Sequence, residues 1–217
     1  CRPSRRASAS CAWKGSDVHL ACLDMEGVLV PEIWINVAER TGIEELKRTT
    51  RDEPDYDKLM NYRIGVLAEH KVTLSLIQSV ISSMGPLPGA REFLDDLRRD
   101  YQVVILSDTF YQFGMALMPH LAMPTLFCHD LVISDDMIVG YRLRQADSKT
   151  QAVRSLQALN FTCIATGDSY NDTGMLAAAD AGILFRPPAN VVAEFPQFPV
   201  AEDYTTLRSE FDRAARA

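Results

Sequence analysis

Short, uninterrupted apolar runs alternate with amphipathic segments along most of this chain. The runs VHLACL (18–23), VVIL (103–106), FTCIAT (161–166) and AGILF (181–185) lack the polar and apolar alternation of a half-exposed strand. Strands buried on both faces of a parallel sheet have this character, and the segments between them have helical spacing. The sequence therefore predicts an α/β fold with a doubly wound parallel sheet, in which AGILF is the last core strand.

Helices are predicted between these runs, where apolar residues recur at intervals of three and four. In residues 86–100 this spacing places Phe93, Leu94 and Leu97 on one inward face. The other elements expected in this part of the chain are helices over 109–121 and 148–160, a hairpin turning near Asp135 and Asp136, and a helix in the C-terminal tail.

Residues 31–84 have no strand signal and are predicted to consist of helices and loops. A first helix is expected over 31–42, with Pro31 in its first turn. Two amphipathic helices follow between 55 and 84, and the first has an apolar face made of Leu59, Tyr62, Val66 and Leu67. We expect residues 31–84 to form a small inserted helical cap on a core made of residues 17–30 and 85–217.

Residues 1–16 differ in composition from the rest of the chain. They carry four basic residues and no acidic one. This composition resembles a transit peptide, but the segment has no apolar stretch of the kind found in signal sequences. We expect an N-terminal extension that is disordered or an artefact of the start site, with a targeting segment as the alternative.

The charge balance argues against some classes of partner. The chain has 22 basic and 29 acidic residues among its 217, a formal net charge of -7. This charge would repel nucleic acid and anionic membranes, and no run approaches the roughly 18 apolar residues of a membrane span. We expect neither partner. The oligomeric state is left open, with a homodimer as one option.

The cysteines predict the compartment. Their number, five, is odd, and Cys22 and Cys163 lie inside apolar runs, where a free thiol packs as a small hydrophobe. A disulfide framework is not expected, and we predict a cytoplasmic protein.

Polar residues, most of them acidic, lie at the carboxyl ends of three predicted strands. They are Asp24 and Glu26 after the first strand, Ser107 and Asp108 after the second, and Asp168, Asn171 and Asp172 after the third. Each one alone could be a helix N-cap or a turn residue. Ligands of open α/β sheets bind outside the carboxyl ends of the strands, so three such coincidences predict one site.

A divalent cation is predicted at this site. The carboxylates of Asp24, Asp168 and Asp172 would repel one another unless a cation joined them, and oxygen ligands of this kind suit Mg²⁺. Zinc is not expected, because no Cys/His cluster has the spacing of zinc ligands. The four histidines are scattered, so we assign them no catalytic role.

Four motifs in order resemble the signature motifs of the haloacid dehalogenase superfamily of aspartyl-phosphate-forming phosphatases. They are DMEGVLV (24–30), LSDT (106–109), Lys149 in DSKTQ, and GDSYND (167–172). The long interval between Asp24 and Ser107 matches members with a helical cap after the first motif, including phosphoserine phosphatases. The stretches DMEGVLVPEIW, TTRDEPDYD, QVVILSDTFY, GDSYNDT and EFPQFP resemble the bacterial phosphoserine phosphatases with phosphoserine:homoserine phosphotransferase activity.

The resemblance implies the catalytic and metal-binding roles. Asp24 would be the nucleophile that forms an aspartyl phosphate. Mg²⁺ would be held by Asp24, the backbone carbonyl of Glu26 and Asp168. Glu26 stands where the superfamily usually has Asp as acid and base. The longer side chain leads to the hypothesis that homoserine, in place of water, takes the phosphoryl group.

The resemblance also implies which residues bind the phosphoryl group. Ser107 and the backbone N–H of Asp108, at a helix N-terminus, would bind phosphoryl oxygens beside the positive charge of Lys149. Asp172 would hold metal-bound waters or orient Lys149. Asn171 would contact substrate or phosphate.

Substrate choice is expected to come from the cap. Glu32 and Arg63 match the positions that bind the ammonium and the carboxylate of phosphoserine in that family, and Arg51 is a second candidate for the carboxylate. Without the resemblance, a solvated helix face would be the simpler interpretation of each residue.

Three other functions are compatible with some of these residues. A receiver-type phospho-acceptor domain uses similar residues, but its lysine follows its acids, whereas Lys149 precedes GDSYND. A phosphatase for another small phosphomonoester stays open, and it would not need both Glu32 and Arg63. An inactive scaffold is disfavoured, because every catalytic residue type is present.

Overall fold

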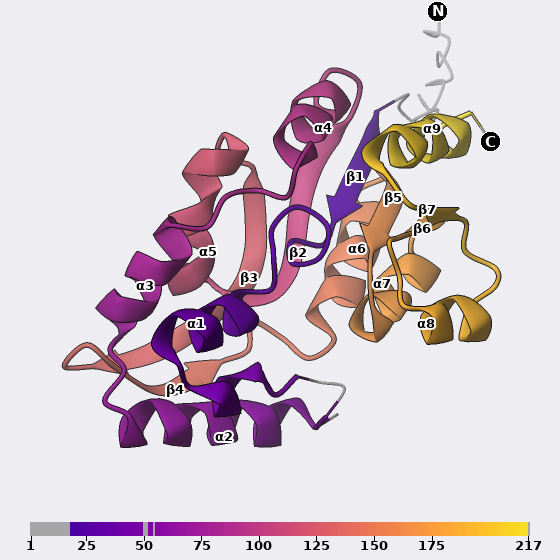
Figure 1. The fold of residues 1–217 in the computed structure, drawn as a ribbon. Helices are drawn as coiled ribbons and strands as arrows, with labels where there is room; N and C mark the ends of the chain where they lie inside the picture. The colour runs from indigo at the N-terminus through magenta and orange to yellow at the C-terminus, as the bar shows by residue number, and fades with distance from the viewer. Residues whose placement is uncertain (1–17, 50–51, 54, 217) are drawn as a thin grey trace, which may run out of the picture.

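The computed structural model describes residues 18–49, 52–53 and 55–216 (Figure 1). Within them, seven strands form one sheet in the order β4-β3-β2-β1-β5-β6-β7. Neighbouring strands are parallel except β3 and β4, which form an antiparallel hairpin. The strands are β1 His19–Leu23, β2 Gln102–Phe110, β3 Thr125–Ser134, β4 Met137–Arg142, β5 Thr162–Gly167, β6 Ala181–Phe185 and β7 Val200–Ala201.

Helices cover the sheet and extend beyond one of its ends. The α-helices of the described chain are α1 Ile33–Thr41, α2 Tyr56–Glu69, α3 Leu74–Ser82, α4 Ala90–Leu97, α5 Tyr111–Leu117, α6 Ser148–Ala158, α7 Thr173–Ala178, α8 Ala189–Glu194 and α9 Tyr204–Ala214. Short 3-10 helices are η1 Glu44–Lys47, η2 Met118–Leu121 and η3 Tyr170–Asp172.

Alternate residues of β1 enter two separate hydrophobic clusters. Ala21 and Leu23 belong to the cluster that includes residues of α1, α3, α4, α5 and α9. Leu20 and Cys22 belong to the cluster that includes residues of α6, α7 and α8. Both faces of the strand are therefore covered, which is why its sequence shows no polar alternation. The predicted doubly wound parallel sheet is confirmed.

The strand order places the carboxyl end of β1 where ligands bind in such sheets. β1 lies between β2 and β5, and the chain builds β2 and β3 on one side of it and β5, β6 and β7 on the other. The crevice at such a reversal lies outside the carboxyl ends of the strands. Asp24 directly follows β1, so it stands at this crevice.

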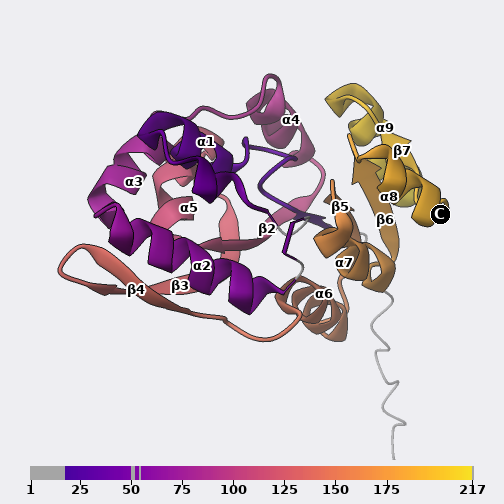
Figure 2. The same cartoon turned by 60° about the horizontal axis from the view of Figure 1, so that its bottom comes forward.

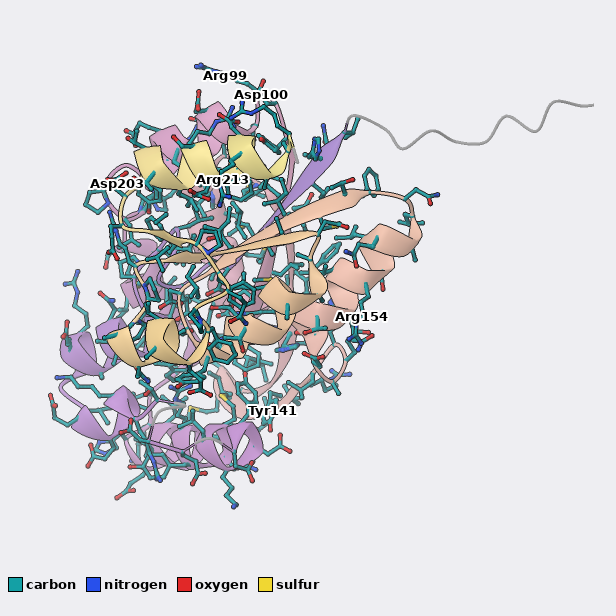
Figure 3. All side chains as sticks on the ribbon, turned by 90° about the vertical axis from the view of Figure 1, so that its right-hand side faces the viewer. Arg99, Asp100, Tyr141, Arg154, Asp203 and Arg213 are labelled. Carbon is teal, nitrogen blue, oxygen red and sulfur yellow. The ribbon has the colours of Figure 1, made fainter. Side chains whose placement is uncertain are left out.

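The helices between residues 31 and 84 gather against the β3–β4 hairpin and α5 (Figures 1 and 2). Trp34 of α1 makes an edge contact with Phe113 of α5, at a centroid distance of 5.5 Å. On the other side, Tyr141 of β4 lies beside α2 and donates its hydroxyl hydrogen to Asp57 (Figure 3). These helices thus share one hydrophobic cluster with the sheet. The division into a core and a cap stays a prediction.

The turn of the hairpin is also joined to α3. The backbone carbonyl of Asp136 accepts the N–H of Leu74 at 2.7 Å, and its Oδ1 accepts both the N–H and the hydroxyl of Ser75 at 3.1 and 3.0 Å. Asp135 makes one long contact, with the hydroxyl of Ser134 at 3.4 Å. The hairpin turn, which the sequence predicts at these two aspartates, therefore anchors the start of a helix that the sequence assigns to the cap.

Two predictions within the helical segment are wrong. Pro31 does not lie in the first turn of a helix, because α1 begins at Ile33 with Glu32 as its N-cap residue. Tyr62 does not belong to the buried face of α2, since it is 37% exposed and its ring lies 5.0 Å from the Arg48 guanidinium. Arg63 is buried on this helix.

Two more boundaries differ beyond the cap. The helix after β2 begins at Tyr111 and not at Thr109, because β2 continues to Phe110, which pairs with His129 of β3. AGILF is not the last strand, because the two-residue β7 pairs with it in the tail. A strand of two residues is too short to leave a periodic signal.

The structure describes only some of the features that were predicted from composition. Cys22, Cys128 and Cys163 are buried free thiols. Within the described residues, no single helix has the length and apolar character to cross a membrane, and α2 and α3 meet that test only when joined across a 105° bend. Residues 1–16 lie outside the described chain.

We expect Asp135→Gly and Asp136→Gly to change stability in opposite directions. Both residues have positive φ (50° and 63°), which glycine adopts without strain, so Asp135→Gly should raise the free energy of unfolding by about 0.5 kcal/mol. Asp136→Gly removes the acceptor of Ser75 and should lower it by about 1 kcal/mol. Urea unfolding measures both changes, and shifts of equal sign would contradict the anchoring of α3 by Asp136.

Candidate active site

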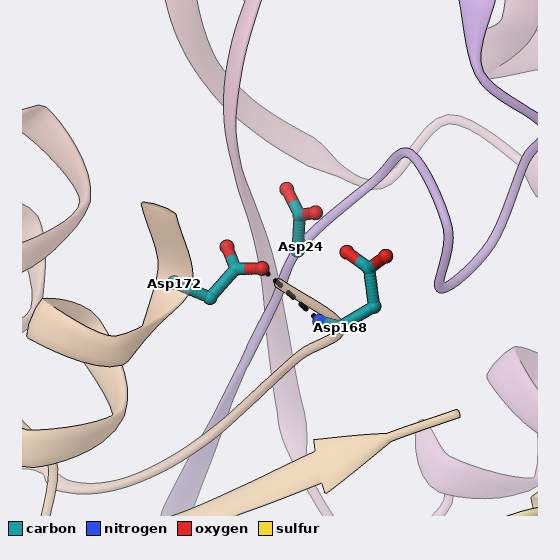
Figure 4. Close-up of side chains that lie close together, drawn as sticks. All are labelled: Asp24, Asp168 and Asp172. Atoms are coloured by element: carbon teal, nitrogen blue, oxygen red, sulfur yellow. Dashed lines mark hydrogen bonds between the residues drawn. The ribbon is translucent and has the colours of Figure 1, made fainter. Parts of the chain in front are cut away.

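Three carboxyl groups come together at the carboxyl edge of the sheet (Figure 4). Asp24 follows β1, Asp168 follows β5 and Asp172 ends η3, and each offers an oxygen within 4.8 Å of the others. Asp172 Oδ2 accepts the backbone N–H groups of Asp168 and Ser169 at 3.0 and 3.1 Å. These bonds fold the loop after β5 back on itself and direct Asp172 towards Asp24.

The three carboxyl groups are electrostatically unfavourable in this position. Burial raises the pKa of Asp24 well above its usual range, and repulsion from Asp172 adds to the effect. Burial and the charges of Asp172 and Glu32 raise the pKa of Asp168 to about 7. A cation would relieve this repulsion, and carboxylate oxygens are the ligands of hard divalent cations. The residues present therefore fit a divalent metal ion.

Gly27 lets the backbone approach Asp168. A Cβ atom at Gly27 would lie 2.6 Å from the Asp168 carboxyl carbon, and its φ of 78° favours glycine. The turn is closed by the bond from Gly27 N–H to the Val30 carbonyl at 2.9 Å. The backbone next to Glu26 thus lies against the carboxylate with which it is predicted to share a metal ion.

Lys149 places one positive charge among the acids. Its side chain is 4% exposed, and Nζ lies 2.8 Å from Asp24 Oδ1, 2.7 Å from Asp172 Oδ1 and 3.4 Å from Asp108 Oδ2. Burial alone would lower the pKa of Lys149, but the three carboxylates raise it well above its usual value. The amine therefore stays charged. Of the two roles predicted for Asp172, its contacts match the one that orients Lys149.

Ser107 and Asp108 lie in the last part of β2. Ser107 is buried, and its Oγ accepts the N–H of Thr109 at 3.2 Å, which leaves the hydroxyl hydrogen to donate elsewhere. The prediction that both residues lie at a helix N-terminus is wrong, because the strand continues through them and α5 starts only at Tyr111. Ser107 and Asp108 therefore have no helix dipole beside them, and the nearest positive charge is the buried ammonium of Lys149.

Glu26 is held protonated by its surroundings. Its Oε2 accepts the N–H of Ile33, the first residue of α1, at 2.9 Å. Burial, followed by the charge of Glu32, raises the pKa of Glu26 to about 8. At neutral pH this side chain therefore carries a proton that it can donate.

Arg63 is a buried cation with an unused donor. The residue is 6% exposed, its guanidinium lies 4.6 Å from the centre of the Trp34 ring, and Nη2 donates to the Arg48 carbonyl at 2.8 Å. Its Nε is buried and has no partner in the described chain. Burial lowers the pKa of Arg63 to about 10, so it stays charged. A buried N–H of this kind requires an acceptor, which a bound anion would supply.

One cavity of about 290 Å³ joins nearly all of the predicted site residues, at the low end of the range for small-molecule sites. It is lined by Asp24, Glu26, Glu32, Arg63, Ser107, Asp108, Lys149, Asp168 and Asn171, among others. Asp172 is fully buried behind Lys149. Arg51 lies outside the described residues.

A second, larger cavity of about 810 Å³ adjoins the first at Tyr56, Asp108, Lys149, Ser169 and Asn171. His129 lines it, and its Nε2 lies 3.6 Å from Asp108 Oδ1. Tyr56 donates its hydroxyl hydrogen to the Asp108 carbonyl at 3.0 Å. Neither residue was predicted from the sequence. For His129, a usable signal was its place in the apolar run TLFCHDLVI, next to the strand that carries Ser107.

Comparison with known proteins identifies relatives of this chain. Residues 18–180 match the haloacid dehalogenase-like hydrolase family. The phosphoserine phosphatase of Pseudomonas syringae pv. tomato is 57% identical over 199 residues, 91% of this chain and 84% of that protein. The phosphoserine phosphatase ThrH of Pseudomonas aeruginosa is also 57% identical over 199 residues, 91% of this chain and 97% of that protein.

Solved structures share the fold at low sequence identity. A substrate-bound phosphoserine phosphatase complex has a TM-score of 0.73 and 18% identity, over 90% of this chain and 98% of that chain. The phosphoserine phosphatase of T. onnurineus in complex with NDSB-201 has a TM-score of 0.68 and 22% identity, over 90% of this chain and 96% of that chain. The predicted fold class is therefore confirmed.

We expect Gly27→Ala to weaken the binding of a divalent cation by at least about tenfold, because the new methyl group would displace the Asp168 carboxylate. Gly42→Ala is the matched control, since Gly42 also has positive φ (72°) but a Cβ there would meet nothing within 4 Å in the described chain. Calorimetric titration with Mn²⁺ measures both affinities. Equal binding by the two variants would argue against Asp168 as a ligand.

Proposed function

We propose that this chain, which belongs to the haloacid dehalogenase-like hydrolase family, is a phosphoserine phosphatase that forms an aspartyl phosphate on Asp24. The observation that carries the proposal is the placement of two buried cations in one cavity. Lys149 contacts the carboxylate that would attack phosphorus, and Arg63 offers an unpartnered donor. The carboxylate of a substrate would supply the acceptor that Arg63 lacks, and a phosphate at Asp24 would lie beside the Lys149 ammonium.

We assign the metal to Asp24, Asp168 and the backbone carbonyl of Glu26, and Mg²⁺ to the site. Both oxygens of Asp172 are already engaged, by Lys149 and by backbone N–H groups, so Asp172 is the poorer ligand. When bound, the ion supplies positive charge that offsets the repulsion between the carboxylates and a phosphate.

In the first step, Asp24 attacks phosphorus as a carboxylate, a form that Lys149 and a bound cation would favour, and the bond from phosphorus to the serine oxygen breaks. The leaving oxygen takes the proton of Glu26, whose raised pKa keeps that proton in place at neutral pH. Lys149 holds Asp24 through Oδ1, and the Ser107 hydroxyl is left to donate to a phosphoryl oxygen.

In the second step, Glu26 acts as a base. An incoming hydroxyl gives its proton to the Glu26 carboxylate and attacks phosphorus, and the bond between phosphorus and the Asp24 oxygen breaks. Water as acceptor yields free phosphate, whereas homoserine yields phosphohomoserine. Both acceptors would occupy the place that serine has left, so the same cap residues would bind homoserine.

The amino-acid end of the substrate would lie between Glu32 and Arg63. Glu32 is exposed at the start of α1 and can pair with an ammonium group. The guanidinium of Arg63, held by Trp34 and the Arg48 carbonyl, can bind a carboxylate. A phosphorylated sugar or amine lacks one of these groups or both.

Phosphate release from L-phosphoserine tests the reaction. We expect turnover by the native chain with Mg²⁺, none after its removal by a chelator, and a loss of at least roughly 10³-fold in Asp24→Asn, which keeps the shape of the nucleophile and removes its charge. Adding L-homoserine and following phosphohomoserine measures transfer. Turnover that Asp24→Asn retains would rule out the aspartyl phosphate, and phosphate release without phosphohomoserine would rule out transfer.

Substitutions in the cap test the substrate. We expect Arg63→Lys, which keeps the charge but not the planar pair of donors, to raise KM for phosphoserine by about tenfold, and Glu32→Gln to do the same. Turnover of para-nitrophenyl phosphate, which has no amino-acid end, serves as the control and should change by less than about threefold. An unchanged KM for phosphoserine in both variants would favour another small phosphomonoester as the substrate.

A further inference from the structure

The Asp108 carboxylate stands between the two cavities and has neighbours on both oxygens. Oδ2 lies 3.2 Å from Asn171 Nδ2 and 3.4 Å from Lys149 Nζ. Oδ1 lies 3.4 Å from Ser148 Oγ and 3.6 Å from His129 Nε2. Burial alone would raise the pKa of Asp108, but Lys149 and His129 hold it below its usual range. The carboxylate is thus ionised and depends on these donors.

The surroundings of His129 determine which ring nitrogen carries its proton. Nδ1 accepts the backbone N–H of Arg144 at 3.1 Å, so the neutral ring carries its proton on Nε2. That nitrogen faces Asp108 Oδ1. The side chain is 3% exposed, and its ring lies 6.4 Å from the Phe110 ring, so the donor is held on β3 in one direction.

Lys149 is the residue through which Asp108 can affect the reaction. Its Nζ is 2.7 and 2.8 Å from Asp172 and Asp24, but 3.4 Å from Asp108. Without the polar Nε2–H group of His129 at 3.6 Å, Oδ1 would keep only the long contact with the Ser148 hydroxyl among the described residues, and the ionised Asp108 carboxylate would move towards the nearest cation, which is Lys149. The ammonium would then be drawn from Asp24 and from the phosphoryl oxygens.

Building on the proposed phosphatase function, we propose that His129 is a positioning residue: through Asp108, it keeps the Lys149 ammonium directed at Asp24 and at the phosphoryl group. His129 lines the larger cavity and not the smaller one that holds Glu32 and Arg63. Its loss therefore weakens the contacts that Lys149 makes with the phosphoryl group in the transition state, and so slows phosphoryl transfer. Recognition of the amino-acid end of the substrate is left unchanged.

Two amide substitutions separate this role from simple packing. His129→Asn places an amide oxygen near the position of Nδ1, so it can still accept the Arg144 N–H, but it lacks the donor towards Asp108. His129→Gln places its amide nitrogen near the position of Nε2, so it keeps that donor and loses the acceptor. Thermal unfolding of both variants shows that each folds and measures the structural cost.

The kinetic test uses two inhibitors that each report on one end of the site. Orthovanadate resembles the phosphoryl group in its five-coordinate transition state, and L-serine resembles the amino-acid end. In His129→Asn we expect kcat for phosphoserine to fall by about tenfold with KM nearly unchanged, and the inhibition constant of vanadate to rise by a similar factor. The inhibition constant of serine stays the same. His129→Gln stays within about threefold of the native chain in all four quantities.

Two results would overturn the role of His129. Equal losses in both variants, or losses that follow their melting temperatures, would show that the ring acts only by packing. Native kinetics and native vanadate inhibition in His129→Asn would show that its contact with Asp108 does not matter.

Failure of the phosphatase proposal would be seen in the native chain and not in the variants. If the native chain does not turn over phosphoserine and serine does not inhibit it, the substrate is wrong. The same two variants are then compared with para-nitrophenyl phosphate and vanadate, neither of which has an amino-acid end to contact Glu32 and Arg63. A tenfold loss confined to His129→Asn would still support the positioning role, and its absence would overturn it.

Discussion

The structure is organised around one buried ammonium group that three carboxylates share. Lys149 lies in the first turn of α6. Its ammonium contacts Asp24 at the end of β1, Asp108 in β2 and Asp172 in η3. Parallel strands end at a common edge of the sheet, so these four segments meet at one point. If one of these strands were misplaced, a buried charge would lose its partner, and the free energy of unfolding would fall by about 3–5 kcal/mol. The same contacts that specify the fold therefore build the site.

The site still has more negative than positive charge. With Asp168 included, four acids surround one lysine, which explains why burial and mutual repulsion raise the pKa values of Asp24 and Asp168. Such a site favours a divalent ion before it can accept a phosphate. Arg63, which lines the same cavity, would then bind the other anionic end of the substrate that we propose. Charge balance thus explains both the metal and the selectivity that we propose.

The sequence predicts the sheet and the acidic cluster well, because burial on two faces leaves uninterrupted apolar runs and polar residues at strand ends converge. It does not predict contacts between side chains on neighbouring strands, because the sequence does not show which strands pair or in what register. His129 sits in an apolar run, and only the pairing of β3 with β2 brings it to Asp108. The helix after β2 starts two residues later than predicted for a related reason: the register of β2 with β3 shifts between Leu106 and Phe110, and nothing local in the sequence marks such an irregularity.

β3 has a mechanical consequence that follows from its length. The strand carries His129 beside Asp108 and continues to Ser134. The turn that follows holds the start of α3, because Asp136 accepts hydrogen bonds from Ser75. β4 returns along it and contacts α2 through Tyr141. The helices α2 and α3, and His129 beside Asp108, are thus attached to the same β3–β4 hairpin. We therefore expect a displacement of those helices to act on the hairpin and, through β3, on the position of His129 beside Asp108.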